Sequence, residues 1–147
     1  MKEYDLERFI KAQNEHGIYE LALSEIKAGK KRSHWIWFIF PQLKSLGFSY
    51  NAQYYGIEDI NEAKNYLKHT ILGKRLFEIS EALLKLDENN PAIVMGGSPD
   101  DMKLQSSMTL FAAVSETDSI FQRVLEKFFN GKMDEKTLKI LGISKSV

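Results

Sequence analysis

The chain has 147 residues, of which 44 % are hydrophobic and 12 % aromatic, which is typical of a folded domain with one hydrophobic core. Its 20 basic and 20 acidic residues cancel, so no overall field draws it to nucleic acid, and nucleic-acid binding is not expected. The absence of cysteine excludes disulfides, thiolate metal sites and a cysteine nucleophile, and it fits the cytoplasm, which is the expected location.

The first third of the chain predicts short helices. Apolar residues recur at helical spacing over residues 6–13, with Asp5 as the expected cap, and again over residues 18–26. Residues 34–40 form a continuous apolar run that periodicity alone cannot assign to a strand or a helix, and the helical neighbours favour a short helix. Residues 46–56 predict an irregular connection rich in aromatic side chains.

The middle of the chain predicts two amphipathic helices. Asp59 is the expected cap of the first, whose apolar residues between 60 and 67 share one face. The pair Leu72-Gly73 is expected to separate it from a longer helix that ends near Leu84.

Turn signals divide the last third in the same way. Ser98 is the expected cap of a helix that runs to about Val114, with proline at its first position. The next helix should be capped near Thr117 or Asp118 and end at Asn130-Gly131, before a last turn or two. No linker divides the chain, so residues 1–147 predict one compact all-α domain of about six to eight short helices.

Both tryptophans lie in the apolar run, which His34 precedes and Gln42 follows. We interpret the run mainly as a core segment, because so many large side chains are costly to expose. The alternative is that Trp35 or Trp37 leaves an indole face at a cleft, where a planar ligand stacks. His34 is then a candidate acid or base, although such a histidine more often bonds a nearby backbone group.

Two further positions are candidates for binding an anion. Arg32 belongs to a basic turn before an expected helix start, although charged turns are usually only solvated. His69 and Arg75 bracket a second turn, where the guanidinium can bind a carboxylate or phosphate in a bidentate way. An ion pair of Arg75 with Glu78 or Glu81 is the simpler explanation.

A polar cluster occupies the helix expected after Ser98. Lys103 falls at helical offsets from Ser106 and Ser107, so it can activate a hydroxyl or hold an anion, and Asp101 is a candidate acid or base. The simpler interpretation is structural, since helical serines often bond back to a carbonyl. The three histidines show no ligand spacing, so neither a metal nor a cofactor is expected.

Three signatures in this chain resemble a bacterial family. They are His-Trp-Ile-Trp-Phe-Ile-Phe-Pro-Gln from residue 34, His-x-x-Leu-Gly-x-Arg-Leu from residue 69, and Gly-Ser-Pro-Asp-Asp-x-Lys-x-x-Ser-Ser-Met-Thr-Leu-Phe from residue 97. The family is the domain-of-unknown-function family numbered eighteen-ten, whose frequent label calpastatin does not fit, because calpastatin is a long disordered inhibitor. The resemblance implies a compact, mostly helical single domain and brings no established activity.

Because the signatures keep polar residues inside them, the resemblance predicts that these side chains converge on one cleft beside the tryptophans. The residues are His34, Gln42, His69, Arg75, Asp101, Lys103, Ser106, Ser107 and Thr109. The expected function is a pocket for an anionic planar small molecule, nucleotide-like or a sugar phosphate, with catalysis left open. The alternative is a non-catalytic structural or protein-interaction module. No apolar run approaches the roughly 18 residues of a membrane span, so no membrane association is expected, and the oligomeric state stays open.

Overall fold

The computed structural model describes residues 3–143, and every regular element in that range is helical. The elements are α1 (Glu7–Asn14), η1 (Glu15–Gly17), α2 (Ile18–Lys27), α3 (Ile36–Ile39), η2 (Lys44–Leu46), α4 (Tyr50–Tyr54), α5 (Ile60–Lys68), α6 (Leu72–Leu84), α7 (Pro91–Val94), α8 (Asp100–Ala113), α9 (Ile120–Phe129) and α10 (Glu135–Leu141). The expected all-α fold is confirmed, and so is the short helix inside the tryptophan run.

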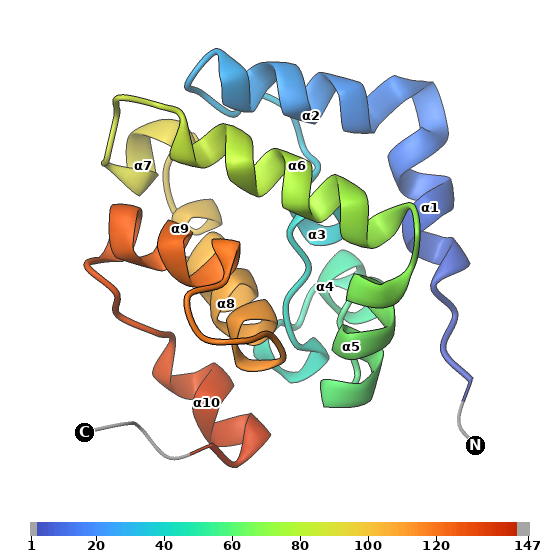
Figure 1. Cartoon of the computed structure of the whole chain (residues 1–147). Helices are drawn as coiled ribbons and strands as arrows, with labels where there is room; N and C mark the ends of the chain where they lie inside the picture. The colour runs from blue at the N-terminus through green and yellow to red at the C-terminus, as the bar shows by residue number, and fades with distance from the viewer. Residues whose placement is uncertain (1–2, 144–147) are drawn as a thin grey trace.

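The two longest helices, α6 and α8, organise the rest (Figure 1). Helix α6 contacts α2, α5 and α9, while α8 contacts α3, α5, α7, α9 and α10. In Figure 1, α6 crosses the front of the molecule and α3 lies behind it. The chain therefore forms one compact domain in which short α3 is enclosed by longer helices.

Large aromatic side chains fill the space that these helices enclose. Trp35, Phe9, Tyr66 and Phe111 are all fully buried. The ring centroids of Phe9 and Tyr66 lie 5.1 Å apart in an edge-on arrangement, and those of Tyr66 and Phe111 lie 5.3 Å apart. Such pairs stabilise the core beyond the area they bury. The interpretation of the tryptophan run as core holds for most of its members, whereas Trp37 remains partly exposed.

The structure confirms some of the expected helix ends. The carboxylate of Asp59 accepts a hydrogen bond from the Glu62 amide and caps α5. Asn130 ends α9 in the left-handed conformation, and Asp134 caps α10. In each case a residue of the right type lies directly beside the apolar repeat, so local sequence suffices to define the boundary.

Three expected caps are wrong. Helix α1 begins after Leu6 without a side-chain cap, so Asp5 does not cap it. Helix α8 begins at Asp100, and the hydroxyl of Ser98 donates to the Asp101 carboxylate instead of capping the helix. The cap of α9 is Ser119, one or two residues later than expected. Helices α1 and α8 thus begin without a side-chain cap, although polar residues precede them, and of the three only α9 is capped by a side chain.

Two connections also differ from expectation. The aromatic connection contains a helix, α4, whose Ser49 hydroxyl accepts from the Ala52 amide. Gly73 does not separate two helices but belongs to the first turn of α6. A Cβ atom there would lie 2.1 Å from the Leu67 carbonyl oxygen, so the missing side chain lets α6 approach the end of α5.

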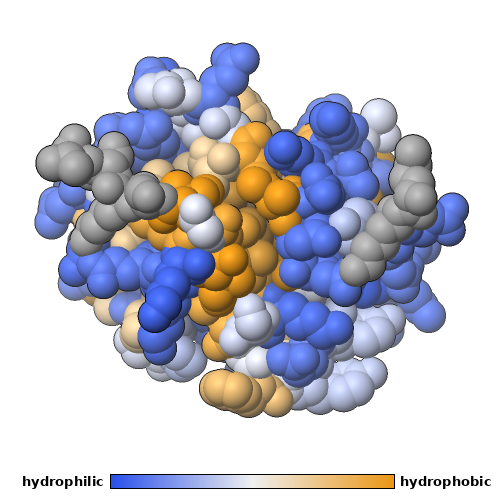
Figure 2. Space-filling model, turned by 90° about the horizontal axis from the view of Figure 1, so that it is seen from below, coloured by the Kyte–Doolittle hydropathy of each residue, from blue (hydrophilic) through white to orange (hydrophobic). Residues whose placement is uncertain are grey.

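The surface is not uniformly polar. Figure 2 shows a strip of apolar side chains across the face seen from below Figure 1, bordered on both sides by hydrophilic ones. The apolar core thus reaches the surface on this face. Within residues 3–143, every helix is too short or too polar to span a bilayer.

Candidate ligand-binding site

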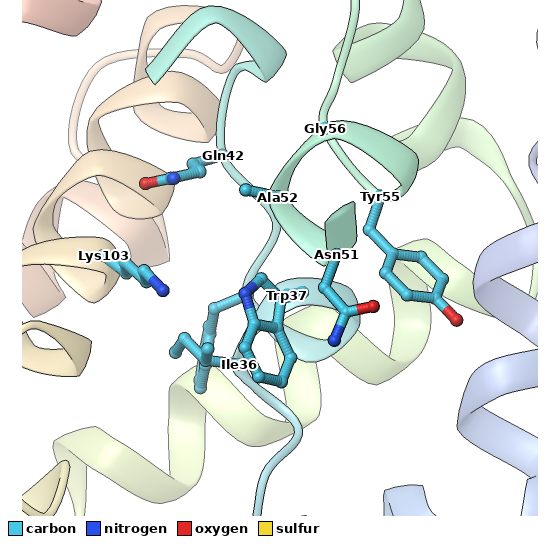
Figure 3. A pocket seen from close by; sticks show the side chains of 9 residues that line it. Ile36, Trp37, Gln42, Asn51, Ala52, Tyr55, Gly56 and Lys103 are labelled. Carbon is cyan, nitrogen blue, oxygen red and sulfur yellow. The ribbon is translucent and has the colours of Figure 1, made fainter. Parts of the chain in front are cut away.

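A small pocket lies where α3, α4 and α8 meet (Figure 3). It has about 230 Å³ of empty space, part of which is open to solvent, and its inner part has room for about one water molecule. It is lined by Ile36, Trp37, Phe40, Gln42, Asn51, Ala52, Tyr55, Gly56 and Lys103. Three residues predicted to bind a ligand, Trp37, Gln42 and Lys103, therefore come together here.

The indole nitrogen of Trp37 is the unusual atom of this pocket. Nε1 is buried, and no protein atom within residues 3–143 accepts a hydrogen bond from it. Trp35, two residues earlier, donates from its own Nε1 to Glu25 over 2.9 Å. Since buried N–H groups nearly always have an acceptor, Trp37 Nε1 is a donor that the described residues leave unsatisfied.

Lys103 supplies positive charge beside this donor. Its Nζ lies 5.3 Å from the centroid of the Trp37 ring, and no carboxylate within residues 3–143 forms an ion pair with it. In Figure 3 the side chain extends from α8 toward the indole, whose nitrogen lies on the side that faces Lys103. An indole N–H and an ammonium group next to each other favour an oxyanion.

Backbone contacts between residues 42 and 57 hold the opposite wall. The Gln42 carbonyl accepts from the Ile57 amide over 2.8 Å, and the Lys44 amide donates to the Ile57 carbonyl over 2.9 Å. The backbone at Gly56 also packs closely against Lys44, since a Cβ atom at Gly56 would lie 2.4 Å from the Lys44 Cα. The position of Gln42 at the rim is thus fixed by its backbone.

Asn51 of α4 and Tyr55, the residue directly after α4, also line the pocket. The Tyr55 ring is half-buried against Phe38, with centroids 5.2 Å apart. Burial raises the pKa of its hydroxyl, and the neighbouring Tyr54 and Glu15 raise it further, so Tyr55 stays neutral at physiological pH. In Figure 3 its hydroxyl points away from Trp37, so its ring forms the wall.

A wider groove continues outward from the pocket. It shares Gln42 and Lys103 with the pocket and extends to Leu46, Pro99, Met102, Ser106, Asp134 and Lys136, with about 530 Å³ of space open to solvent. Ser106 thus lies near Lys103, as its spacing predicts. Its hydroxyl donates to the Met102 carbonyl over 3.2 Å. This is the bond back to a helix carbonyl that the structural interpretation of the serine predicts.

The prediction that all the signature residues converge on one cleft is wrong. Arg75 lies on α6, where its guanidinium donates to Gln13 over 3.1 Å and to Asn14 over 2.8 Å, and stacks over Tyr19. His69 accepts at Nδ1 from the Ile71 amide over 3.1 Å, at the start of α6. Arg75 thus joins α6 to α1 and His69 stabilises the turn before α6, and neither lines the pocket.

The residues before the tryptophan run also have structural partners. Glu25 accepts four hydrogen bonds, from the Arg32 amide, the Ser33 amide and hydroxyl, and Trp35 Nε1. Burial alone raises the pKa of this carboxyl, but the four donors outweigh it and lower the pKa to about 2. Trp35 is fully buried and offers no stacking face, while His34 and the Arg32 side chain are exposed and line neither cavity.

A buried ion pair attaches this segment to α8. Lys31 Nζ lies 2.7 Å from the Asp100 carboxylate and 4.9 Å from the centroid of the Trp35 ring, with only 6 % of the lysine side chain exposed. The next residue, Asp101, bonds locally, since its carboxylate accepts from the Ser98 hydroxyl and the Met102 amide. Asp101 therefore does not face the pocket.

The two remaining candidates lie inside α8. The Thr109 hydroxyl donates to the Gln105 carbonyl and accepts from the Asp134 amide, which attaches the start of α10 to α8. The Ser107 hydroxyl is buried and has no hydrogen-bond partner in the described part of the chain, and Ser107 lines neither cavity. Neither residue lines the small pocket between α3, α4 and α8, which we call the Trp37 pocket.

Sequence reasoning missed several lining residues, most clearly Asn51, Tyr55 and Gly56. They lie in and after α4, a helix of five residues whose sequence has no apolar period. The signal available was the density of aromatic side chains around Tyr54-Tyr55-Gly56. Across residues 3–143, no group of three or more His, Asp or Glu side chains is arranged to hold a metal ion.

The structure therefore defines an all-α domain with a small, mainly apolar pocket, with a few polar groups, at a junction of three helices. The chain belongs to the family described as protein of unknown function (DUF1810), which matches residues 3–141 and confirms the resemblance carried by the three signatures. The chain is also similar to the crystal structure of the conserved hypothetical protein Rv1873 from Mycobacterium tuberculosis. The two share 40 % sequence identity and a TM-score of 0.90 over 96 % of this chain and 99 % of that one. No curated protein matches the chain.

Proposed function

We propose that this protein binds a small molecule through a carboxylate or phosphate group in the Trp37 pocket. One oxygen of that group accepts the hydrogen bond of Trp37 Nε1 and pairs with Lys103 Nζ. The observation that carries the proposal is the buried indole nitrogen, which has no acceptor among the described residues. Beside it lies Lys103, whose Nζ is 5.3 Å from the centroid of the Trp37 ring and forms no ion pair with a described residue. Charge-assisted hydrogen bonds of this kind are roughly twice as strong as neutral ones.

The size of the cavities divides the ligand into two parts. The inner pocket admits about one atom with its hydrogen-bond partners, so a single oxygen enters beneath Lys103. The rest of the ligand lies in the outer groove, whose apolar wall includes Met102 and Leu46. A planar ligand does not stack on Trp35, which is enclosed in the core.

Binding, rather than catalysis, is what the pocket supports. Lys103 and Tyr55 are the titratable side chains among those that line it. His34 and Asp101, the other candidates for acid–base chemistry, do not line it. The alternative role as a protein-interaction module draws on a different surface, the exposed aromatic side chains around α4.

The two indole N–H resonances of ¹⁵N-labelled protein test the proposal, with Trp35 as the internal control. Acetate, inorganic phosphate, sugar phosphates and nucleotides are titrated in turn, and Trp37→Phe assigns the resonances. We expect a bound oxyanion to shift the Trp37 resonance and leave that of Trp35 in place. Lys103→Met should weaken this binding by about tenfold or more.

Two variants separate this site from other basic positions. Lys74→Met removes an exposed charge on α6, and Arg75→Ala removes the guanidinium bound to α1; both should leave the affinity unchanged. The proposal is refuted if no oxyanion moves the Trp37 resonance, or if Lys103→Met binds as tightly as the native protein.

A further inference from the structure

The outer surface around α4 carries exposed aromatic side chains. Phe48 is 97 % exposed, Tyr50 77 % and Tyr54 45 %. Tyr50 and Tyr54 are one helical turn apart, and their rings stack with centroids 5.8 Å apart and planes inclined by only 8°. We name these three residues the α4 aromatic surface. Large aromatic side chains gathered in water are typical of a binding surface.

This surface is held in place from beneath. The Gln53 side chain donates to the carbonyls of Lys44 and Gly47, and the Tyr54 ring packs edge-on against Tyr55 with centroids 4.8 Å apart. Arg8 donates through Nε to the Tyr54 carbonyl over 2.8 Å. A surface fixed in this way loses little conformational freedom when a partner binds.

Negative charge lies next to the rings. A hollow of about 460 Å³, open to solvent, adjoins Tyr54 and is lined by the acidic residues Glu3, Asp5, Glu58 and Glu62. Its basic residues are Arg8, which forms an ion pair with Glu62 at 2.9 Å, and Lys44. Leaving Glu58 and the Arg8–Glu62 pair aside, Glu3 and Asp5 outnumber Lys44 among the described lining residues, so the hollow keeps an excess of negative charge. Carboxylates and the negative faces of aromatic rings both attract a cation.

We propose that the α4 aromatic surface binds an arginine side chain presented by a partner protein. The guanidinium lies flat on the tyrosine pair and reaches the carboxylates of the hollow. The stacked pair holds its rings nearly parallel, so the outer face of a ring is a fixed flat surface, which suits the planar guanidinium of arginine better than the compact ammonium of lysine. This site differs from the Trp37 pocket in charge and in location, so either can exist without the other.

Fluorescence anisotropy of labelled hexapeptides tests this proposal, with hexa-arginine, hexa-lysine and hexa-glutamate as probes. We expect hexa-arginine to bind most tightly and hexa-glutamate not to bind. Tyr50→Leu and Tyr54→Leu keep apolar area but remove the ring, and each should weaken hexa-arginine binding by about threefold to fivefold. Tyr54→Phe keeps the ring and should bind like the native protein.

Phe77→Leu is the matched control, because Phe77 is an aromatic residue of α6 that is 51 % exposed. It should leave the affinity unchanged, and circular dichroism confirms that each variant is folded. Equal binding of hexa-lysine and hexa-arginine would overturn the proposal, because charge alone would then explain the attraction. An equal loss in Phe77→Leu would also overturn it. So would dimerisation in light scattering that Tyr54→Leu abolishes, because a second copy would then cover the surface.

Discussion

Glu25→Gln removes the charge that holds the segment before the tryptophan run. The native carboxyl is 8 % exposed and receives four hydrogen bonds, and its pKa falls from the ordinary 4.5 to about 2. A difference of this size corresponds to about 3 kcal/mol of folding free energy at neutral pH. Glutamine keeps one carbonyl oxygen as acceptor, so we expect the variant to lose about 1 to 3 kcal/mol at pH 7.

The pH dependence of this loss identifies its cause. Because the folded pKa lies below the unfolded one, the stabilisation is fully present above pH 4.5 and is lost as the pH falls toward about 2. Urea unfolding at a series of pH values between neutral and acidic should show the native protein and the variant converging in stability. Glu20→Gln, an exposed change on the same helix, is the control. A stability difference that stays constant down to acidic pH would refute the role assigned to the carboxylate charge.

Three further changes test the structural contacts, each by urea unfolding. Lys31→Met should lower the free energy of unfolding by about 2 to 4 kcal/mol, because it leaves the largely buried Asp100 carboxylate unpaired. Lys30→Met, a change at an exposed lysine, should leave that free energy almost unchanged. Gly73→Ala should cost at least about 2 kcal/mol because its Cβ meets the Leu67 carbonyl; a neutral effect would show that α5 and α6 separate freely. His69→Ala should lower the free energy of unfolding by about 1 kcal/mol because the Ile71 and Leu72 amides lose their acceptor, and His69→Asn should restore it.

The sequence allows prediction where a contact is local. The tryptophan run is buried because its own composition requires it, and the cap of α5 follows from Asp59 and the residues after it. Lys103 and Trp37 were also identified, Lys103 by its charge and Trp37 as one of the two tryptophans of the run. In each case the sequence pattern that allows the prediction lies within a few residues of the helix end or side chain that it predicts.

Prediction fails where a polar residue has a distant partner. From the sequence, Arg75 resembles a ligand-binding residue. In the structure its guanidinium donates a hydrogen bond to the side chain of Gln13, 62 positions earlier. His69 fails for a different reason, because its partner is the nearby Ile71 amide, which only the conformation of the turn brings within reach. No property of such a side chain alone distinguishes a ligand from a helix on the other side of the core, because both satisfy the same hydrogen bonds.

The structural contacts also determine the geometry of the candidate site. Trp37 follows the segment that Glu25 binds, and Lys103 lies one helical turn after Asp100, which Lys31 holds. Glu25 and Lys31 both contact Trp35, so one buried indole sets the position of the segment relative to α8. The distance between Trp37 and Lys103 is therefore fixed by residues that do not line the pocket. Such preorganisation explains why the Trp37 N–H and the Lys103 ammonium can stay close together without a protein acceptor between them.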